Sequence, residues 1–232
     1  MEKNLISSGS DIITKIREVA GKLKVDIPEN LKEFDTWKKG IIGAVPYFGE
    51  FLNNALRTRD DSENIKILSF YFDLDSQFQK LEEDTIKKDY LKSDEFYCLI
   101  KKIIEKVRLE HDETTRKLAR NFVLNSIRKD KPTIDYRYYA EKIFEINIEH
   151  LNILEWYYNH NWDAPNKIGS DYDSQKRLFS TNVGQSFVEK EFQLSVLGFL
   201  YIVQIDAYQK NRYCLSPAGI KFYEFIQHNE SD

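Results

Sequence analysis

Apolar residues recur at steps of three and four along most of the chain, the spacing that places them on one face of an α-helix. No heptad is sustained and no repeat recurs at a fixed period, so the pattern is typical of a helical bundle and not of a coiled coil or a solenoid. The pattern predicts longer helices over residues 10–23, 60–83, 93–108, 113–128 and 148–158. A shorter helix is predicted to end at about Ile146.

Polar residues in these segments indicate where the helices begin and which faces meet water. Ser10 is the predicted N-cap of the first helix, and Asn147 is the predicted N-cap of the helix 148–158. Such side chains accept hydrogen bonds from free backbone amides. Pro28 interrupts the pattern after the first helix, since the residue before a proline avoids the helical region. Asp73 and Asp75 lie off the apolar stripe of residues 60–83, on the face predicted to be polar.

The last quarter of the chain shows a different order of elements. Residues 187–197 predict an apolar helix, and Gly198 ends it because glycine tolerates the left-handed cap. Residues 201–208 are rich in β-formers and precede a polar turn at 209–211, after which residues 212–215 return the chain.

A final helix follows this hairpin, with Ser216 as its N-cap and Pro217 in its first turn. The order helix, hairpin, helix predicts a winged-helix-like domain over residues 147–232. Residues 1–146 are predicted to form a helical bundle. The predicted fold class is therefore mainly α, with a small two-stranded antiparallel wing.

Glycines and a proline punctuate the apolar segment 40–56, which allows two interpretations. Because Pro46 has no amide hydrogen, a helix is predicted to start near it and to run to about Leu56. The segment is either a turn where two helices pack closely or an amphipathic wedge that contacts a membrane, and its few lysines count against the wedge. Both interpretations use the same residues: Gly43, Pro46, Phe48, Gly49, Phe51 and Leu52.

Length and composition bound the classes of protein that are possible. The 232 residues provide for one large domain or two small ones, and a hydrophobic fraction of 41% suits a packed core. Two cysteines far apart in the sequence fit a reducing compartment, and the N-terminus lacks the apolar run of a signal peptide. The apolar segment 41–56 is too short to span a bilayer. We therefore expect a soluble, cytoplasmic protein.

No motif in the chain predicts catalysis. Phosphate-binding loops, nucleophile elbows and zinc ligands at productive spacings do not occur in the sequence. His111, Asp112 and Glu113 are adjacent, so their side chains would diverge on a helix, and Asp112 is better interpreted as an N-cap. We therefore predict no catalytic, metal or cofactor residue and no small-molecule substrate. An enzyme would require carboxylates that are distant in sequence to converge in a cleft.

A winged helix can contact DNA through one helix, here the predicted helix 187–197, and through its wing. The cations available for such contacts, or for contacts with a protein partner, are Lys176, Arg177, Lys190, Lys210 and Arg212. Glu189 and Glu191 lie among them, and the net charge of the chain is −4, so the charge available to hold a phosphate backbone is small. The tyrosine-rich stretch 135–144 is either a base-stacking surface or, more often in proteins, helix packing.

Two resemblances rest on particular residues. The stretches LSVLGFLYIV (194–203) and RYCLSPAGIKFYEF (212–225) resemble the end of bacterial winged-helix domains, in which "Tyr-x-Leu-Thr-x-x-Gly" opens the last helix. Tyr213, Leu215, Ser216 and Gly219 fill those places, with serine for threonine. Residues 116–158, together with this tail, resemble the abortive-infection alpha proteins of bacteria. This resemblance implies a helical bacterial protein with a role in defence against phage, and it carries over no catalytic residue.

Three hypotheses of function follow. The first is a non-enzymatic protein that acts through protein–protein contacts, with a protein partner or by self-association, in abortive infection. The second is a winged-helix regulator that binds DNA. The third is a membrane-active effector that uses residues 41–56.

Overall fold

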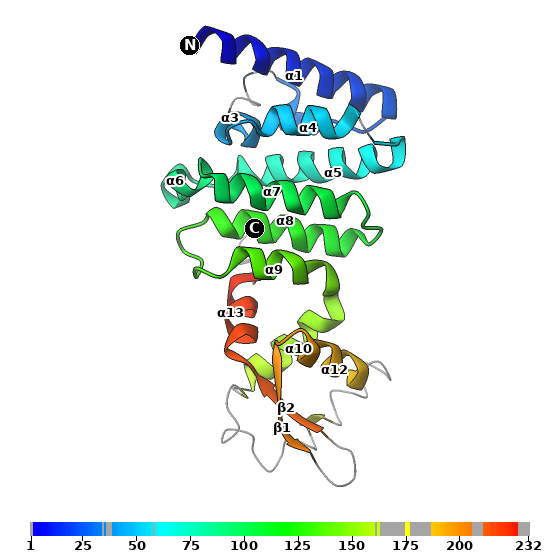
Figure 1. The fold of residues 1–232 in the computed structure, drawn as a ribbon, viewed down its shortest axis with the longest axis vertical. Coiled ribbons are helices and arrows are strands. Elements are labelled where there is room, and N and C mark those ends of the chain that lie inside the picture. The colour runs from blue at the N-terminus through cyan, green and yellow to red at the C-terminus, as the bar shows by residue number, and fades with distance from the viewer. Residues whose placement is uncertain are drawn as a thin grey trace. The chain divides into compact units, whose positions relative to one another are not determined.

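The computed structural model describes residues 2–33, 35, 39–57, 59–160, 162, 175–176, 187–205 and 211–226. The chain divides into two compact units, Met1–Lys131 and Pro132–Asp232, which we call the N-terminal and C-terminal units. The described residues are mainly helical, and a small antiparallel sheet lies near the C-terminus, as the sequence pattern predicts (Figure 1).

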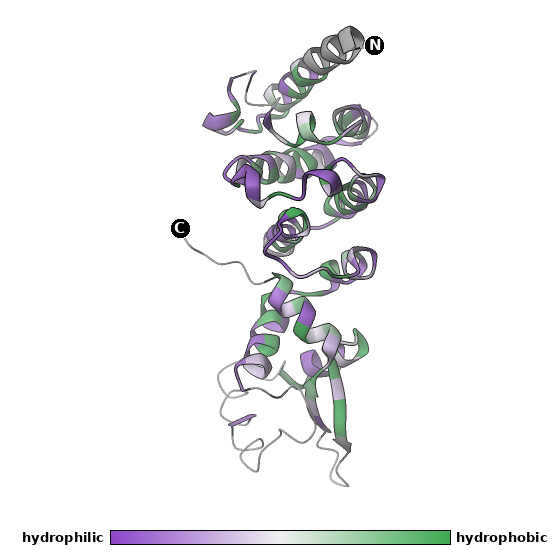
Figure 2. Cartoon of the chain, turned by 90° about the vertical axis from the view of Figure 1, so that its left-hand side faces the viewer, coloured by the Kyte–Doolittle hydropathy of each residue, from purple (hydrophilic) through white to green (hydrophobic). Residues whose placement is uncertain are grey.

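The regular elements among the described residues of the N-terminal unit are all helices, apart from one isolated β-bridge between Ile86 and Arg128. Helices α5, α7 and α8 pack on one another, and α1 packs on α4 and α5. In Figure 2 these helices each carry hydrophobic and hydrophilic residues, as amphipathic helices around a shared core should. The elements are α1 (Glu2–Leu23), η1 (Glu29–Leu31), α3 (Ile41–Ala44), α4 (Phe48–Arg57), α5 (Asp61–Phe78), η2 (Glu83–Thr85), α6 (Lys88–Leu91), α7 (Asp94–Val107) and α8 (Glu113–Ile127).

The first helix corrects one sequence prediction. Helix α1 begins at Glu2, so Ser10 lies inside the helix and is not its N-cap. The physical reason is visible in the sequence, because Leu5 and Ile6 precede Ile12 and Ile13 by two helical turns and continue the same apolar pattern.

The segment 40–56 forms two helices with a tight turn between them. Tyr47 has a φ of 59°, a left-handed conformation that cannot continue a helix, so α4 begins at Phe48 and not at Pro46. Phe48 and Leu52 have no exposed surface. A Cβ atom on Gly49 would lie 3.3 Å from the Ile12 side chain, which shows how closely α4 approaches α1.

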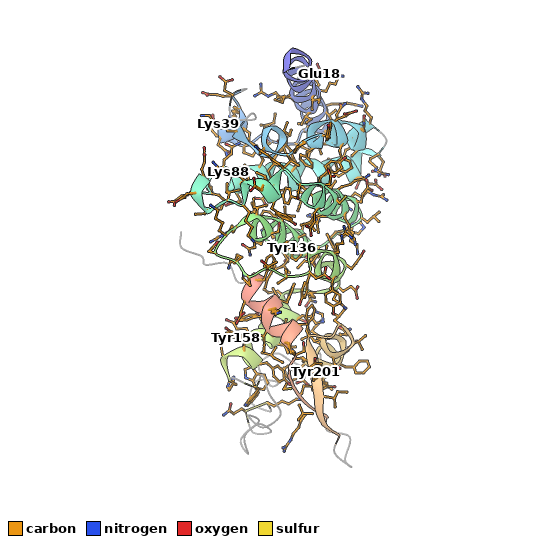
Figure 3. All side chains as sticks on the ribbon, turned by 60° about the vertical axis from the view of Figure 1, so that its left-hand side comes forward. Glu18, Lys39, Lys88, Tyr136, Tyr158 and Tyr201 are labelled. Carbon is orange, nitrogen blue, oxygen red and sulfur yellow. The ribbon has the colours of Figure 1, made fainter. Side chains whose placement is uncertain are left out.

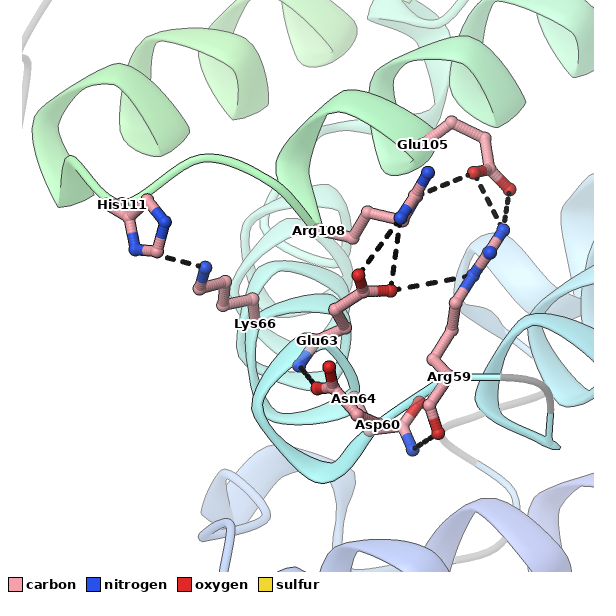
Figure 4. Close-up of polar contacts among 8 residues, drawn as sticks. All are labelled: Arg59, Asp60, Glu63, Asn64, Lys66, Glu105, Arg108 and His111. Atoms are coloured by element: carbon pink, nitrogen blue, oxygen red, sulfur yellow. Dashed lines mark hydrogen bonds and ion pairs between the residues drawn. The ribbon is translucent and has the colours of Figure 1, made fainter.

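A network of ion pairs joins the start of α5 to α7 (Figure 4). Arg108 Nη1 lies 3.0 Å from Glu63 Oε1, and Arg59 Nη2 lies 2.9 Å from Glu105 Oε2. Arg108 Nε also contacts Glu105 at 3.0 Å, so each charge has an opposite neighbour. The network therefore links two helices through partly buried charges that are each paired with an opposite charge. We interpret its role as structural.

The C-terminal unit combines helices with a β-hairpin. Strand β1 pairs antiparallel with β2, and Leu200 lies opposite Leu215, with an irregularity between Ile202 and Gln204. The hairpin prediction is confirmed, although β1 begins at Leu200 and residues 206–210 of the predicted strand and turn lie outside the described part of the chain. The elements are α9 (Tyr136–Lys142), η3 (Ile143–Glu145), α10 (Ile148–Asn159), α12 (Phe187–Val196), β1 (Leu200–Ile205), β2 (Asn211–Leu215) and α13 (Pro217–Ile226).

The helix caps of this unit follow the sequence prediction. Asn147 Oδ1 accepts a hydrogen bond from His150 N at 3.1 Å, and Asn147 N donates one to His150 Nδ1 at 3.2 Å, so the two residues form a capping box. Ser216 Oγ accepts a hydrogen bond from Gly219 N at 2.9 Å. Gly198 ends α12 with a φ of 81°.

Aromatic packing places residues 136–145 in the C-terminal unit. The Tyr139 ring stacks on Phe222 with centroids 5.4 Å apart, and its hydroxyl donates a hydrogen bond to Ala218 O at 3.0 Å. Tyr139 is buried, which favours helix packing over base stacking for this tyrosine-rich stretch. The N-terminal unit ends at Lys131, whereas the sequence pattern predicts a domain boundary after Ile146.

Candidate interaction surface

Helix α12 carries three apolar side chains that are each more than half exposed. Val188, Phe192 and Val196 are 64%, 56% and 69% exposed. Steps of four place them in one row along the helix, which we call the α12 stripe. Tyr201 of the neighbouring strand β1, labelled in Figure 3, is exposed as well. Grouped exposed apolar side chains mark interaction sites in soluble proteins.

The opposite face of α12 supplies the helix with its core contacts. Phe187 and Leu194 are buried there, and the helix packs on α10 and β1. The α12 stripe is therefore not needed to hold α12 in place. The sequence shows apolar residues at 187–188, 192, 194 and 196, but it does not show which face of the helix is covered, so the sequence alone does not predict the stripe.

A buried carboxylate holds the inner face of α12. Glu191 has no exposed surface, and its Oε1 accepts a hydrogen bond from the Tyr157 hydroxyl at 2.5 Å. Lys176 Nζ lies 2.6 Å from Glu191 Oε2. Burial raises the pKa of Glu191, and the lysine and the tyrosine hydroxyl act in the opposite direction by stabilising the charge. Lys176, a candidate DNA contact, is thus engaged within the unit.

Two further polar links tie α12 to α10. Lys190 Nζ lies 2.8 Å from Glu149 Oε2, and its side chain is 15% exposed. Gln193 Oε1 lies 2.8 Å from His150 Nε2, and burial lowers the pKa of that imidazole. Helix α12, which carries the α12 stripe, is therefore held in place by its buried face and by two polar links to α10.

The remaining candidate residues are scattered. Arg212 is half-buried in β2, where it lies opposite Gln204, while Arg177 and Lys210 lie outside the described residues. In the N-terminal unit Gly43 and Pro46 are exposed and Phe51 is half-buried, with its ring 6.3 Å from that of Tyr97. A membrane wedge built on this segment would have to withdraw Phe48 and Leu52 from the core.

Metal-binding clusters do not occur among the described residues. Asp112 caps α8, accepting a hydrogen bond from Thr114 N at 2.9 Å, and His111 Nδ1 lies 3.3 Å from Lys66 Nζ (Figure 4). In the part of the chain that the structure describes, every helix is too short or too polar to cross a bilayer.

Comparisons with known proteins identify no relative. No protein-family model matches the chain, and no curated protein or solved structure matches it either. The resemblance to the abortive-infection alpha proteins therefore stays a prediction from the sequence.

Proposed function

We propose that the protein acts through protein–protein contacts made by the α12 stripe, and that the stripe binds the same stripe on a second copy of the chain. The observation that carries this proposal is the row Val188, Phe192 and Val196, more than half exposed on an anchored helix. Covering such a row removes apolar surface from water, which is the main favourable term in association.

The arrangement of the stripe favours a symmetric partner. Val188 and Val196 lie four residues to either side of Phe192, so the order of side chains along the row is the same from either end. When two α12 helices pair antiparallel about a twofold axis at Phe192, valine meets valine and phenylalanine meets phenylalanine. Glu189 then faces the uncharged Ser195 of the second copy, and no like charges oppose one another along the stripe.

We infer further that the C-terminal unit is of the winged-helix type, with α12, the β1–β2 hairpin and α13 in the expected order (Figure 1). Protein contact is favoured over DNA binding because Lys176 and Lys190 are each paired with a carboxylate. Duplex binding normally needs several phosphate contacts from free cations. A salt-sensitive mobility shift of duplex DNA would instead support the DNA-binding regulator.

The oligomeric state tests the proposed pairing. Sedimentation velocity over a range of concentrations should show a monomer–dimer equilibrium for the natural chain. Phe192→Glu should shift it to the monomer, because the pairing would bury two unpaired carboxylates. Leu109→Glu is the matched control, since Leu109 is 59% exposed but lies in the N-terminal unit, and it should leave the equilibrium unchanged. A natural chain that stays monomeric at every concentration overturns the proposal.

Cross-linking tests the geometry of the pair. With the exposed Cys98 changed to serine, Phe192→Cys should form a disulfide-linked dimer on oxidation, because the two residues face each other at the twofold axis. Leu109→Cys in the same background should form none. Equal cross-linking of both variants would contradict the antiparallel arrangement.

We also propose that this self-association serves a non-enzymatic role in defence against phage, which rests on the resemblance alone. Bacteria that express the natural chain should then form fewer plaques on phage challenge than bacteria that express Phe192→Glu. Equal plaque counts would remove the defence role and leave the pairing itself untouched.

A further inference from the structure

The N-terminal unit contains a pocket of about 510 Å³ beside the segment punctuated by glycines. Its walls come from α3, the end of α5, the segment 79–88 and α6. This volume lies within the range of roughly 300–1,000 Å³ that is typical of sites for small molecules. The pocket is far from the α12 stripe in sequence and belongs to the other unit.

The inner surface of the pocket is apolar. Phe78, Ile86 and Leu91 line it and are otherwise buried in the unit, and Ala44 and Leu81 complete the apolar wall. An apolar body of matching size would gain free energy by displacing water from these side chains.

The polar lining of the pocket is mostly cationic. Lys39, Lys88 and Lys92 line it together with one carboxylate, Glu83, in a chain whose net charge is −4. Lys88 pairs with Glu83 at 2.9 Å, but both side chains are well exposed, so this pair is weak and exchangeable. No ion pair joins Lys39 or Lys92 to another residue that the structure describes. Figure 3 shows Lys39 and Lys88 on the same side of the unit.

One wall of the pocket is held in place from within the core. Asp75 Oδ1 accepts a hydrogen bond from Ile41 N, the first residue of α3, at 2.6 Å. Asp75 Oδ2 accepts another from Gln79 Nε2 at 2.8 Å, and Gln79 itself lines the pocket. The buried carboxylate therefore ties α3 to the end of α5, so the pocket is formed before a ligand arrives, which lowers the entropic cost of binding.

We propose that this pocket binds an amphipathic anion, with an acidic head held by Lys39, Lys88 and Lys92 and an apolar chain lying on Phe78, Leu81 and Leu91. The sequence alone predicts no small-molecule ligand, because Lys39 is distant in sequence from the stretch 78–92 that carries the other residues. The same chemistry is offered by a free alkyl carboxylate and by an anionic lipid in a bilayer, and the experiment separates the two sources.

Calorimetric titration with decanoate, below its micellar concentration, tests the ligand chemistry. The full chain should bind decanoate saturably, and it should bind decanol, which lacks the charge, and inorganic phosphate, which lacks the chain, at least about tenfold more weakly. The variant Lys88→Gln/Lys92→Gln should weaken decanoate binding by about tenfold or more, because charge-assisted contacts to the head are lost. Both lysines are exposed, so the variant should fold normally.

The matched control changes the same number of charges elsewhere on the same unit. Lys101→Gln/Lys117→Gln should bind decanoate as the natural chain does, because neither residue lines the pocket. Co-sedimentation with anionic phospholipid vesicles identifies the source. Pelleting that the Lys88→Gln/Lys92→Gln variant loses indicates a bilayer lipid, and a chain that binds decanoate but stays in the supernatant indicates a free ligand. Equal effects of the two double variants, or no binding to either decanoate or vesicles, overturn the proposal.

Discussion

Asp75 is an ionisable side chain with no exposed surface, on a helix face that the sequence pattern predicts to be polar. Burial raises its pKa to about 6, although the hydrogen bonds from Ile41 N and Gln79 Nε2 favour the charged form. The pattern is wrong here because α5 is covered on more than one side. A side chain off the apolar stripe can then still be buried, and its partner Ile41 lies 34 residues away.

This carboxylate predicts a pH dependence of stability. Its pKa is raised on folding from 3.8 to about 6, so between these values the folded state holds a proton that the unfolded state has lost. The stabilising contribution of Asp75 to the free energy of unfolding is therefore fully present at a pH below its unfolded pKa of 3.8, and it is lost as the pH rises through about 6. Asp75→Asn should remove this dependence, and its stability relative to the natural chain should be about 2 kcal/mol more favourable at pH 7 than at pH 4.

Urea unfolding at the two pH values measures this difference. The matched control is Asp89→Asn, an exposed aspartate of α6 in the same unit, whose effect on the free energy of unfolding should be small at both pH values. A stability difference between Asp75→Asn and the natural chain that is the same at pH 4 and pH 7 would contradict the prediction.

Helices and strands are the scale at which local sequence is most informative. Asp112, Asn147 and Ser216 were predicted to begin helices, and each accepts the expected backbone hydrogen bond, because capping depends only on residues within one turn. A turn between two helices is one of the interpretations predicted for the segment 40–56, but its place at Tyr47 is not predicted, since the left-handed φ of this residue depends on how α3 and α4 pack. The α12 stripe was missed for the same kind of reason.

Gly219 shows why a glycine stands near the start of α13. A Cβ atom there would lie 2.2 Å from the carbonyl oxygen of Phe199, so the helix can approach the start of β1 only without a side chain. Gly219→Ala should lower the free energy of unfolding of the C-terminal unit by about 1–3 kcal/mol, the usual cost of overpacking. Thermal unfolding followed by circular dichroism measures the loss.

Gly21 in α1 is the matched control for this substitution. A Cβ atom on Gly21 would meet nothing within 4 Å, so Gly21→Ala should stabilise the N-terminal unit by about 0.5–1 kcal/mol through helix propensity. Equal effects of the two alanine substitutions would show that the close approach at Phe199 does not limit stability.

The division of the whole molecule into two units could not be located from the sequence. The predicted helix 113–128 ends before Pro132, but Pro28 interrupts the pattern in the same way, so the pattern does not show which break separates the two units. The division depends on where Tyr136 and Tyr139 pack, and their partners Phe225 and Phe222 lie more than 80 residues later. Contacts over such separations leave no periodic signal.

Fragments of the chain test this division. Residues 132–232 should fold cooperatively on their own, whereas residues 147–232, which lack Tyr139, should be less stable by about 3–5 kcal/mol, as for loss of a buried aromatic side chain. Urea unfolding of both fragments checks the difference. Tyr139→Ala in the longer fragment should reproduce most of the loss. Two fragments with the same free energy of unfolding would place the boundary after Ile146 instead.

The α12 stripe has a consequence for how the protein should respond to different salts. Sulfate strengthens the burial of apolar surface because it is excluded from protein surfaces, so it should favour the paired form of the chain. Contacts to a nucleic-acid backbone weaken as any salt is added, because counterions compete for the phosphates. Added ammonium sulfate should therefore strengthen pairing of the chain and weaken binding to nucleic acid. A chain that pairs through Val188, Phe192 and Val196 should also be retained longer on a hydrophobic column as the concentration of this salt rises.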